Sequence, residues 1–281
     1  MLNPDLIICL GDRYEIFAAA YSACIMNIPI AHIHGGELTY GSIDDNFRHA
    51  ITKASSIHFP STNIYKKRII QMGEHPETVH NVGALGVERA LKVEQMSIEE
   101  MEKELNISLE KPYFLVTVHS STKVKGNNFY LINEVLESLN SFSKYTIIMS
   151  YANADAGGYE INKYKKLFCK KNPLKRVLKK SLGHKLYINL LRNCAAVIGN
   201  SSSGVIEAPI LGIPSVNIGN RQDGRVLLDT VINVKIEKIK IIEGINKALL
   251  NKKRITSESF GLGNTSELIY KHLKSFLDNY D

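Results

Sequence analysis

The feature that most constrains the fold is a repeated alternation of short apolar runs with amphipathic segments of helical length. The runs DLIICLG (5–11), IPIAHI (28–33) and YFLVTVH (113–119) have the length of strands and contain almost no polar residues. Strands that are apolar on both faces belong to parallel sheets covered by helices on each side. We therefore predict an α/β protein with doubly wound parallel sheets.

A polar stretch divides this alternation into two series. Residues 91–112 have a helical pattern, with Ser97 and Glu100 spaced as in a capping box. We predict a first Rossmann-like domain at 1–86, a second at 87–265, and a last helix at 266–281 that packs back on the first. Further predicted strands are 56–61, 80–86, 145–150, 195–200 and 214–219, and further predicted helices are 14–26, 44–55, 62–73 and 127–139. Residues 181–193 fit either one helix or a strand at KLYIN.

Composition excludes several classes of protein. The chain has 281 residues, of which 44% are hydrophobic and 22% charged, as in an ordinary globular protein of two domains. Its four cysteines are scattered, so neither a disulfide framework nor a zinc site is predicted. The longest apolar region, 16–33, is interrupted by Ser22, Asn27 and Pro29. We expect a cytoplasmic protein that does not bind a membrane.

The net charge of +7 arises partly from one basic run. Nine of the eighteen residues at 163–180 are Lys or Arg, and we predict a basic helix here. Such a run fits a nucleic-acid footprint, a solvated helix face, or a protein that acts on a small anion. Because no base-stacking aromatic residues alternate with the charges, we predict no nucleic-acid partner.

Polar motifs follow five of the predicted strands. GDR follows 5–11, HIHGGE overlaps the end of 28–33, and HSST, YANADAGG and NSSSG follow later strands. Ligands of doubly wound sheets bind beyond the carboxyl ends of the strands. The five motifs together therefore predict a ligand site, although each one alone is weak.

The motif GNSSSGVIEAP (199–209) has the pattern of a phosphate-binding loop between a strand and a helix. Unpaired backbone N–H groups of a first helical turn bind phosphate, so Ser201, Ser202, Ser203 and Gly204 are candidate ligands. Glu207 is placed to accept hydrogen bonds from a ribose diol. A simple serine-rich cap is the alternative. Pro209 removes a backbone donor, which predicts a short or kinked helix.

Asp12 and Arg13 follow the first strand, where an arginine suits an anion and an aspartate suits proton transfer. The alternative is a capping aspartate beside a surface arginine.

The stretch HIHGGELTYGSIDDNFRHA (32–50) combines several reactive residue types. Ser42 is a predicted N-cap, after which Asp44 with Arg48 and Asp45 with His49 have i,i+4 spacing. These pairs fit an ordinary helix surface as well as a site. Against the ordinary interpretation, the adjacent glycines at 35 and 36 would let the backbone approach a ligand.

Three other residues have two interpretations. His119 ends a strand, Asn153 lies in a turn motif and Arg221 lies in GNRQDGR. Each fits a structural or solvent-facing role as well as a role in binding.

Taken together, GDR, HIHGGE, IDD-x-x-RHAITK, NADAGG, GNSSSGVIEAP and GNRQ-x-GR resemble the hydrolysing UDP-N-acetylglucosamine 2-epimerases. The resemblance covers nearly the whole chain. It implies a GT-B fold with the active site between two domains, a UDP-amino sugar as substrate, and a homo-oligomer. It also implies that neither a metal nor a redox cofactor is required.

The activity that this resemblance implies belongs to sialic or legionaminic acid biosynthesis. UDP-N-acetylglucosamine and water would give N-acetylmannosamine and UDP through a glycal. The alternative substrate is UDP-N,N'-diacetylbacillosamine, the sugar nucleotide of related enzymes.

The resemblance also assigns roles to individual residues. Asp12 and Asp44 match acid/base carboxylates, Arg13 and Arg48 match cleft arginines, and His119 matches a histidine that contacts the nucleotide. The matched UDP-binding positions are Asn153, Ser201, Ser202, Glu207 and Arg221.

Two residues depart from the family pattern. His34 stands where animal and non-hydrolysing relatives have a catalytic glutamate, so the proton-transfer group is either His34 itself or the Glu37 carboxylate. Ser120 follows His119 where proline is usual.

Family members begin several β/α units earlier than this chain, so we expect an incomplete N-terminal domain. The alternatives to an active epimerase are a truncated, non-catalytic UDP-sugar-binding protein and a GT-B glycosyltransferase. The acidic segment IDD-x-x-RHA argues against the glycosyltransferase.

Overall fold

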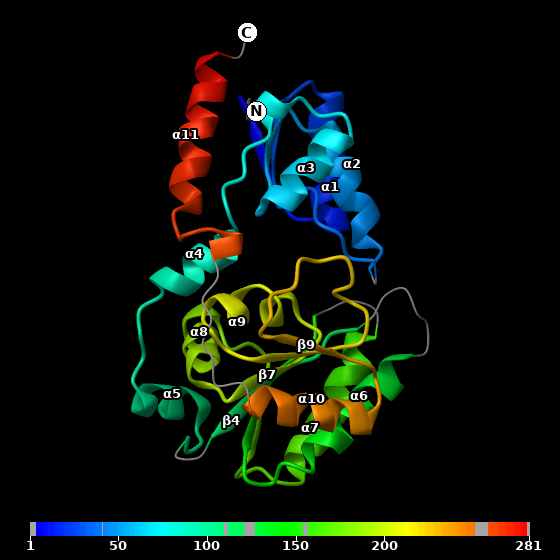
Figure 1. The fold of residues 1–281 in the computed structure, drawn as a ribbon, viewed down its shortest axis with the longest axis vertical. Coiled ribbons are helices and arrows are strands. Elements are labelled where there is room, and N and C mark those ends of the chain that lie inside the picture. The colour runs from blue at the N-terminus through cyan, green and yellow to red at the C-terminus, as the bar shows by residue number, and fades with distance from the viewer. Residues whose placement is uncertain are drawn as a thin grey trace. The chain divides into compact units, whose positions relative to one another are not determined.

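The chain forms two compact units, each built around a parallel sheet. The computed structural model describes residues 4–40, 42–109, 112–120, 127–153, 157–250 and 258–279 (Figure 1). Unit 1 consists of Met1–Lys92 and Glu258–Asp281, and unit 2 of Val93–Ser257. The division therefore falls at residues 92 and 93, and the last helix is part of unit 1.

Unit 1 contains three parallel strands, β1 (Ile7–Leu10), β2 (Ile30–Ile33) and β3 (Ile57–Phe59), in the order β1-β2-β3. Successive side chains of a strand point to opposite faces of the sheet. One face packs on α1 (Tyr14–Ile25) and α2 (Asp44–Ala54) through a core that includes Cys9, Ala20, Ala23, Ile30 and Ile51. The other face packs on α11 (Thr265–Asp278), whose buried Ile269 meets Ala31, Ile33 and Phe59.

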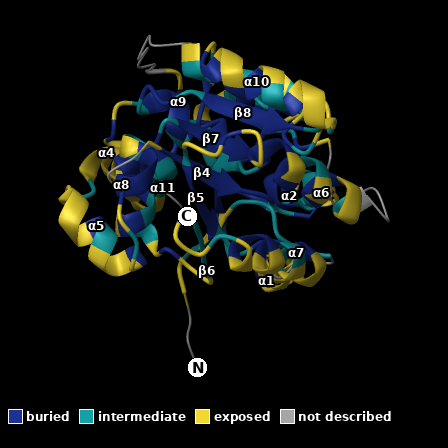
Figure 2. Cartoon of the chain, turned by 90° about the horizontal axis from the view of Figure 1, so that it is seen from below, coloured by how far each residue is buried: buried dark blue, intermediate teal, exposed yellow. Residues whose placement is uncertain are grey.

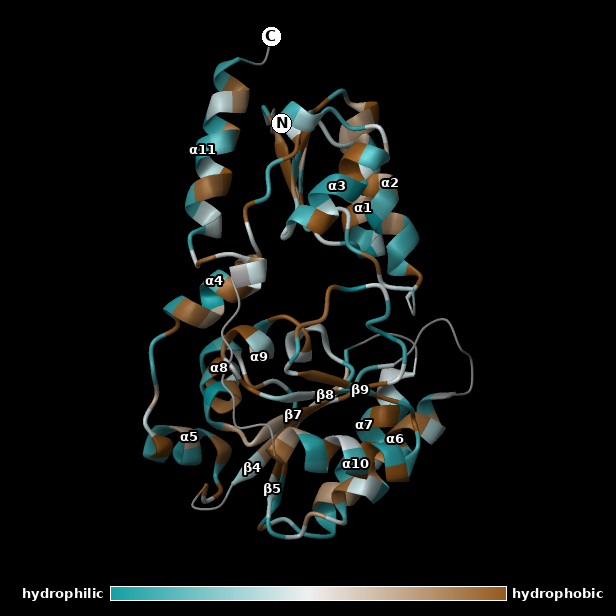
Figure 3. Ribbon diagram, viewed as in Figure 1, coloured by the Kyte–Doolittle hydropathy of each residue, from teal (hydrophilic) through white to brown (hydrophobic). Residues whose placement is uncertain are grey.

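The last helix is attached to unit 1 by polar contacts as well as by this core. Glu88 of α4 (Leu85–Lys92) accepts hydrogen bonds from the backbone N–H and the hydroxyl of Ser266, both at 2.6 Å. The rings of His80 and His272 stack with their centroids 3.8 Å apart. Hydrophobic and hydrophilic residues both occur along α11, as expected of a helix with one packed face (Figure 3).

Unit 2 contains a six-stranded parallel sheet in the order β6-β5-β4-β7-β8-β9. In chain order this is 3-2-1-4-5-6, the order of the Rossmann fold. The four central strands are buried, the edge strands β6 and β9 are partly exposed, and the surrounding helices expose their outward faces (Figure 2). The strands are β4 (Tyr113–Thr117), β5 (Thr146–Ser150), β6 (Arg176–Lys179), β7 (Ala196–Gly199), β8 (Ser215–Ile218) and β9 (Val231–Val234).

The helices of unit 2 begin and end at recognisable signals. Ser97 and Glu100 form the predicted capping box of α5 (Ile98–Leu105), and Asn106 ends this helix in the left-handed region. Residues of α6, α7 and α10 share one hydrophobic core with the strands, and α5 packs against α8. These helices are α6 (Asn127–Leu139), α7 (Gly158–Lys170), α8 (His184–Asn193) and α10 (Lys238–Leu250).

The predicted α/β class with parallel sheets is confirmed, but several elements differ from the prediction. The predicted strand at 80–86 is wrong: only Val79 makes a bridge, to His58, and α4 begins at Leu85. The basic run does not form one helix, because α7 ends at Lys170 and residues 176–179 form β6. Residues 184–193 are helical, and neither β9 nor α10 was predicted.

Within the described ranges, no helix is both long and apolar enough to cross a membrane. All four cysteines lie in these ranges and are free thiols.

We predict that unit 1 loses stability in mild acid. Burial lowers the pKa of His32 to about 3, and burial together with the His272 ring lowers the pKa of His80 to about 4. An unfolded histidine titrates near pH ~6.5. The unfolded chain therefore binds more protons below that pH. The free energy of unfolding is complete above pH ~6.5 and falls as the pH approaches ~4.

Urea unfolding at pH 7.5 and pH 5 measures this loss, of which His32 contributes about 2 kcal/mol. The variant His32→Gln removes its share of the difference. His75→Gln, at an exposed side chain, is the control and leaves the difference unchanged. Equal stability of the wild-type protein at the two pH values would contradict the prediction.

Candidate functional site

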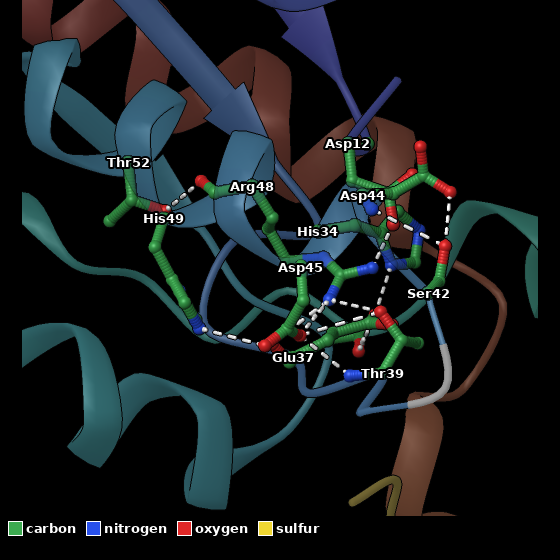
Figure 4. Close-up of polar contacts among 12 residues, drawn as sticks. Asp12, His34, Glu37, Thr39, Ser42, Asp44, Asp45, Arg48, His49 and Thr52 are labelled. Carbon is green, nitrogen blue, oxygen red and sulfur yellow. Dashed lines mark hydrogen bonds and ion pairs between the residues drawn. The ribbon is translucent and has the colours of Figure 1, made fainter. Parts of the chain in front are cut away.

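The carboxyl ends of the three strands of unit 1 bring together several of the predicted site residues. Asp12 lies two residues after β1, His34 and Glu37 lie in the loop after β2, and Ser61 lies two residues after β3. Figure 4 shows the polar contacts among these loops and α2. Parallel strands end at the same edge of a sheet, which explains why residues distant in sequence meet here.

Arg48 is the centre of this cluster. Its side chain is 2% exposed and reaches from α2 towards both loops. Nη2 forms an ion pair with Asp12, while Nη1 donates to the Glu37 carbonyl at 3.0 Å, Thr39 Oγ1 at 3.1 Å and Asp45 Oδ1 at 3.2 Å. The expected i,i+4 pairing of Arg48 with Asp44 is not formed, and Asp44 contacts Ser42 instead.

The start of α2 also differs from the prediction. The residue at the N-cap position is Ile43, not Ser42. The Ser42 hydroxyl instead donates to Asp44 Oδ2 and accepts from the Asp44 backbone N–H at 3.3 Å. Asp45 accepts from the Thr39 N–H at 2.6 Å and lies 3.8 Å from His49 Nε2, in agreement with the predicted i,i+4 pair.

The glycine pair serves packing within the protein. A Cβ on Gly36 would lie 2.6 Å from the carbonyl oxygen of Tyr65 in α3 (Asn63–Gln71). A Cβ on Gly35 would lie 2.9 Å from His32 Nδ1. We expected these glycines to let a ligand approach the backbone. Instead, they let the loop lie against α3 and His32.

His34 and Glu37 form a hydrogen-bonded pair. His34 Nδ1 lies 2.8 Å from Glu37 Oε1, which also accepts from the Ser61 hydroxyl at 3.2 Å. The exposed side chain of Arg13 pairs with Glu15 at 3.2 Å.

His32 is a structural residue that the sequence did not single out. It is fully buried, with Nε2 2.8 Å from the Gly11 carbonyl and Nδ1 3.1 Å from Thr52 Oγ1. Burial keeps its ring neutral at pH 7, since the pKa is lowered to about 3. His32 thus ties the loop that carries Asp12 to α2.

Unit 2 has its candidate site where the strand order reverses, between β4 and β7. Asn200 follows β7, and its side chain accepts from the His119 N–H at 2.8 Å and donates to the His119 carbonyl at 2.9 Å. The Asn200 carbonyl accepts from Arg221 Nη1 at 3.1 Å and from Gln222 Nε2 at 2.9 Å. The Asn200 residue therefore holds together the loops that carry His119 and Arg221, a role its sequence motif did not reveal.

His119 is neutral at pH 7. Burial, together with the nearby charges of Arg221 and Lys165, lowers its pKa to about 3. Nδ1 accepts from the Asn153 N–H at 3.2 Å, so the neutral ring carries its hydrogen on Nε2. His119 can therefore donate a hydrogen bond to a ligand without bringing a positive charge.

Lys165 lies beneath the same loops. It was not distinguished from the other lysines of the basic run by the sequence alone. It is fully buried, and Nζ donates to the Val118 carbonyl at 2.9 Å and the Ser150 carbonyl at 2.8 Å. Burial lowers the pKa of Lys165 to about 7.

The serine loop leads into a very short helix. Residues Ser202–Gly204 form one 3₁₀ turn (η2), and α9 (Glu207–Ile210) has only four residues. The predicted short or kinked helix is confirmed, but so short a helix supplies little dipole for an anion. Ser201 Oγ accepts weakly from the Ser203 N–H at 3.4 Å, and the Ser203 hydroxyl contacts Tyr187.

A cavity of about 910 Å³ adjoins Asn153. Its lining includes four lysines on α7 and after β6, Lys163, Lys166, Lys170 and Lys180. Residues 154–156 of the NADAGG motif lie outside the described ranges. A cavity with this lining favours an anionic ligand.

Among the residues that the structure describes, no group of three or more His, Cys, Asp or Glu side chains is placed to hold a metal ion.

Comparison with known proteins gives a family match over residues 1–274, to the family described as UDP-N-acetylglucosamine 2-epimerase. The chain is 39% identical over 238 residues to a GDP/UDP-N,N'-diacetylbacillosamine 2-epimerase (hydrolyzing) of Campylobacter jejuni. It is 42% identical over 243 residues to a polysialic acid biosynthesis protein of Escherichia coli. These matches cover 85% and 86% of the chain, which spans 62% and 61% of the two relatives.

A solved structure of similar fold is that of Methanocaldococcus jannaschii UDP-GlcNAc 2-epimerase in complex with UDP-GlcNAc and UDP. The TM-score is 0.79 at 24% sequence identity, over 97% of this chain and 76% of that one. This likeness concerns the fold, which is of the GT-B type expected from the sequence.

We predict that Arg48→Met destabilises unit 1 by about 3–5 kcal/mol, because it leaves buried acceptors and the Asp12 and Asp45 carboxylates without their cation. Arg48→Lys keeps the charge but not the planar fork, so an intermediate loss is expected. Urea unfolding measures both variants. Arg13→Met, at an exposed ion pair, is the control, with a loss below about 1 kcal/mol. A similarly small loss for Arg48→Met would show that the cluster does not depend on the guanidinium.

Proposed function

Because the chain belongs to the UDP-N-acetylglucosamine 2-epimerase family, we propose that it catalyses the hydrolysing 2-epimerisation of a UDP-linked 2-acetamido sugar. UDP-N-acetylglucosamine and UDP-N,N'-diacetylbacillosamine are the two proposed substrates. The observation that carries the proposal is the cluster of Asp12, Asp44 and His34 at the strand ends of unit 1. This cluster lies in a chain 39% identical to a relative named as a hydrolysing epimerase.

The proposed reaction has two steps. A base takes the proton from carbon 2, the electrons of that C–H bond form the C1=C2 double bond, and the C1–O bond breaks with its electrons going to UDP. Water then adds across the double bond of the glycal, with hydroxyl at carbon 1 and a proton at carbon 2. Inversion at carbon 2 requires the proton to leave from one face of the ring and return on the other, so two proton-transfer groups are needed.

We assign these proton transfers to the cluster of unit 1. Asp12 is oriented by Arg48, and Asp44 by the Ser42 hydroxyl. The pair of His34 and Glu37 provides a further titratable group in the same set of loops. A carboxylate and an imidazole are the side chains that most often carry out general acid–base catalysis.

We assign the nucleotide to unit 2. Neutral His119 and the cationic Arg221 are held together by Asn200, where they suit the oxygens of a diphosphate. The serine loop, Asn153 and the lysine-lined cavity add hydrogen-bond donors and positive charge at the same strand ends. Glu207 is proposed to accept from the ribose diol. The leaving group's negative charge would thereby be stabilised by fixed donors.

A homo-oligomeric state and a cytoplasmic location remain predictions from the sequence. Arg13 is proposed to contact substrate only after its pair with Glu15 opens.

The proposed activity is tested by incubating the protein with each UDP-sugar in heavy water. We expect UDP release together with one deuterium at carbon 2 of a free, 2-epimeric sugar, both followed by NMR. Asp12→Asn is expected to lower kcat by about 10²–10⁴-fold, the usual contribution of a proton-transfer group.

The other functions give different results in the same experiment. UDP binding by calorimetry, without UDP release from either substrate, would favour a non-catalytic UDP-sugar-binding protein. Transfer of the sugar to an acceptor without deuterium at carbon 2 would favour a glycosyltransferase. Either result would exclude the proposed epimerase.

The proposed nucleotide site predicts that Arg221→Met weakens UDP binding by about 10- to 100-fold, since it removes a charge-assisted contact. Calorimetric titration with UDP measures the change. Lys240→Met, at an exposed lysine of α10 that pairs with Glu243 at 2.9 Å, is the matched control. Unchanged UDP affinity in Arg221→Met would remove Arg221 from the site.

A further inference from the structure

We propose that His34 is the residue that takes the proton from carbon 2, and that Glu37 is a positioning residue that acts only through His34. This inference rests on the proposed function, whose reaction it assigns to a particular atom, His34 Nε2. The sequence alone left open which of the two residues transfers the proton.

The hydrogen bond between the two side chains fixes the histidine tautomer. His34 Nδ1 lies 2.8 Å from Glu37 Oε1. A carboxylate only accepts hydrogen bonds, so Nδ1 carries the hydrogen and Nε2 presents a lone pair. Within the described residues, the hydrogen bond of Nδ1 to Glu37 is the only one that the His34 ring makes. The ring therefore presents a base on the side away from Glu37.

Burial separates the roles of the two side chains. The Glu37 side chain is 3% exposed, whereas that of His34 is 18% exposed. Glu37 Oε1 already accepts from both His34 and Ser61, and its carbonyl accepts from Arg48. A substrate carbon can reach the histidine ring, but the Glu37 carboxylate is enclosed by the protein.

The backbone at His34 is also specialised. Its φ is +66°, in the left-handed region that a residue with a Cβ occupies at a cost of about 1–2 kcal/mol. The conformation is held by a hydrogen bond from the His34 N–H to the Phe59 carbonyl at 3.0 Å and by the close packing of Gly35 on His32. The loop conformation thus fixes the position of the His34 side chain after β2, and Glu37 fixes the tautomer of its ring.

The chemical step balances without any further reagent. The C2 proton moves to Nε2, the C–H electrons form C1=C2, and the electrons of the broken C1–O bond leave with UDP. The imidazolium that forms is stabilised by the adjacent Glu37 carboxylate. The proton on Nε2 is then released to water. The proton that inverts carbon 2 is delivered from the opposite face of the sugar ring.

Two measurements test the pair. In protein labelled with ¹⁵N-histidine, we expect the His34 signal, identified by its loss in His34→Gln, to show a protonated Nδ1 and an unprotonated Nε2 at pH 7.5. Glu37→Gln is expected to shift this signal. In kinetics, His34→Gln is expected to lower kcat by about 10²–10⁴-fold and Glu37→Gln by about 10- to 100-fold, with KM little changed.

The decisive comparison is the double variant. If Glu37 acts only through His34, then adding Glu37→Gln to His34→Gln lowers kcat no further. Glu74→Gln is the matched control, because Glu74 also pairs with a buried histidine of unit 1, His58 Nε2 at 3.2 Å, outside this cluster. It is expected to leave kcat unchanged.

Several results would overturn the inference without affecting the proposed function. These are a protonated Nε2 in the wild-type protein, an unchanged kcat in His34→Gln, or a further loss when Glu37→Gln is added to His34→Gln. If the wild-type protein releases no UDP, the proposed function fails, and the tautomer seen by NMR still decides whether Glu37 sets the His34 ring.

Discussion

The geometry of unit 1 depends on one buried guanidinium. Arg48 comes from α2 and meets acceptors in the loop after β1 and the loop after β2. A planar fork of five N–H donors can serve acceptors that lie in different directions, which an ammonium cannot do equally well. Because an unpaired buried charge is costly, all of these acceptors must be in place for the unit to be stable. The same contacts that stabilise the unit therefore place Asp12.

Unit 2 solves the corresponding problem with a neutral side chain. Asn200 offers a donor and an acceptor, which bind the backbone on both sides of His119, and its carbonyl receives Arg221. An amide adds no charge of its own, so the electrostatic potential at these strand ends is left to Arg221 and Lys165. A charged residue such as Arg48 is suited to holding carboxylates in place, whereas a neutral one such as Asn200 is suited to a site that must bind an anion.

The sequence predicted the central buried strands well, because continuous apolar runs have few alternatives to buried parallel strands. It located the polar residues at the strand ends for the same reason. It missed the partly exposed edge strands β6 and β9, which lack such runs. The sequence did not predict side-chain pairings that depend on contacts between distant segments. Arg48 pairs with Asp12, 36 residues away, and not with the nearer Asp44. The glycines at 35 and 36 were interpreted as openings for a ligand, yet α3 and His32 fill that space. An asparagine that links several loops leaves no periodic pattern in the sequence, so this role of Asn200 was not predicted.

Lys165 illustrates how a charged run can contain a buried role. Its neighbours in the run face solvent or line the cavity, but its own ammonium lies under the ends of β4 and β5, bonded to two carbonyls. Burial lowers the pKa of Lys165 to about 7. An anion bound near these strand ends would therefore favour the protonated form of Nζ, and protonation of Nζ would strengthen binding of the anion. Burial is the main reason that His119 is neutral, and the charges of Arg221 and of the buried Lys165 add to it. Salt screens such a buried charge much less than it screens the charge of a surface lysine.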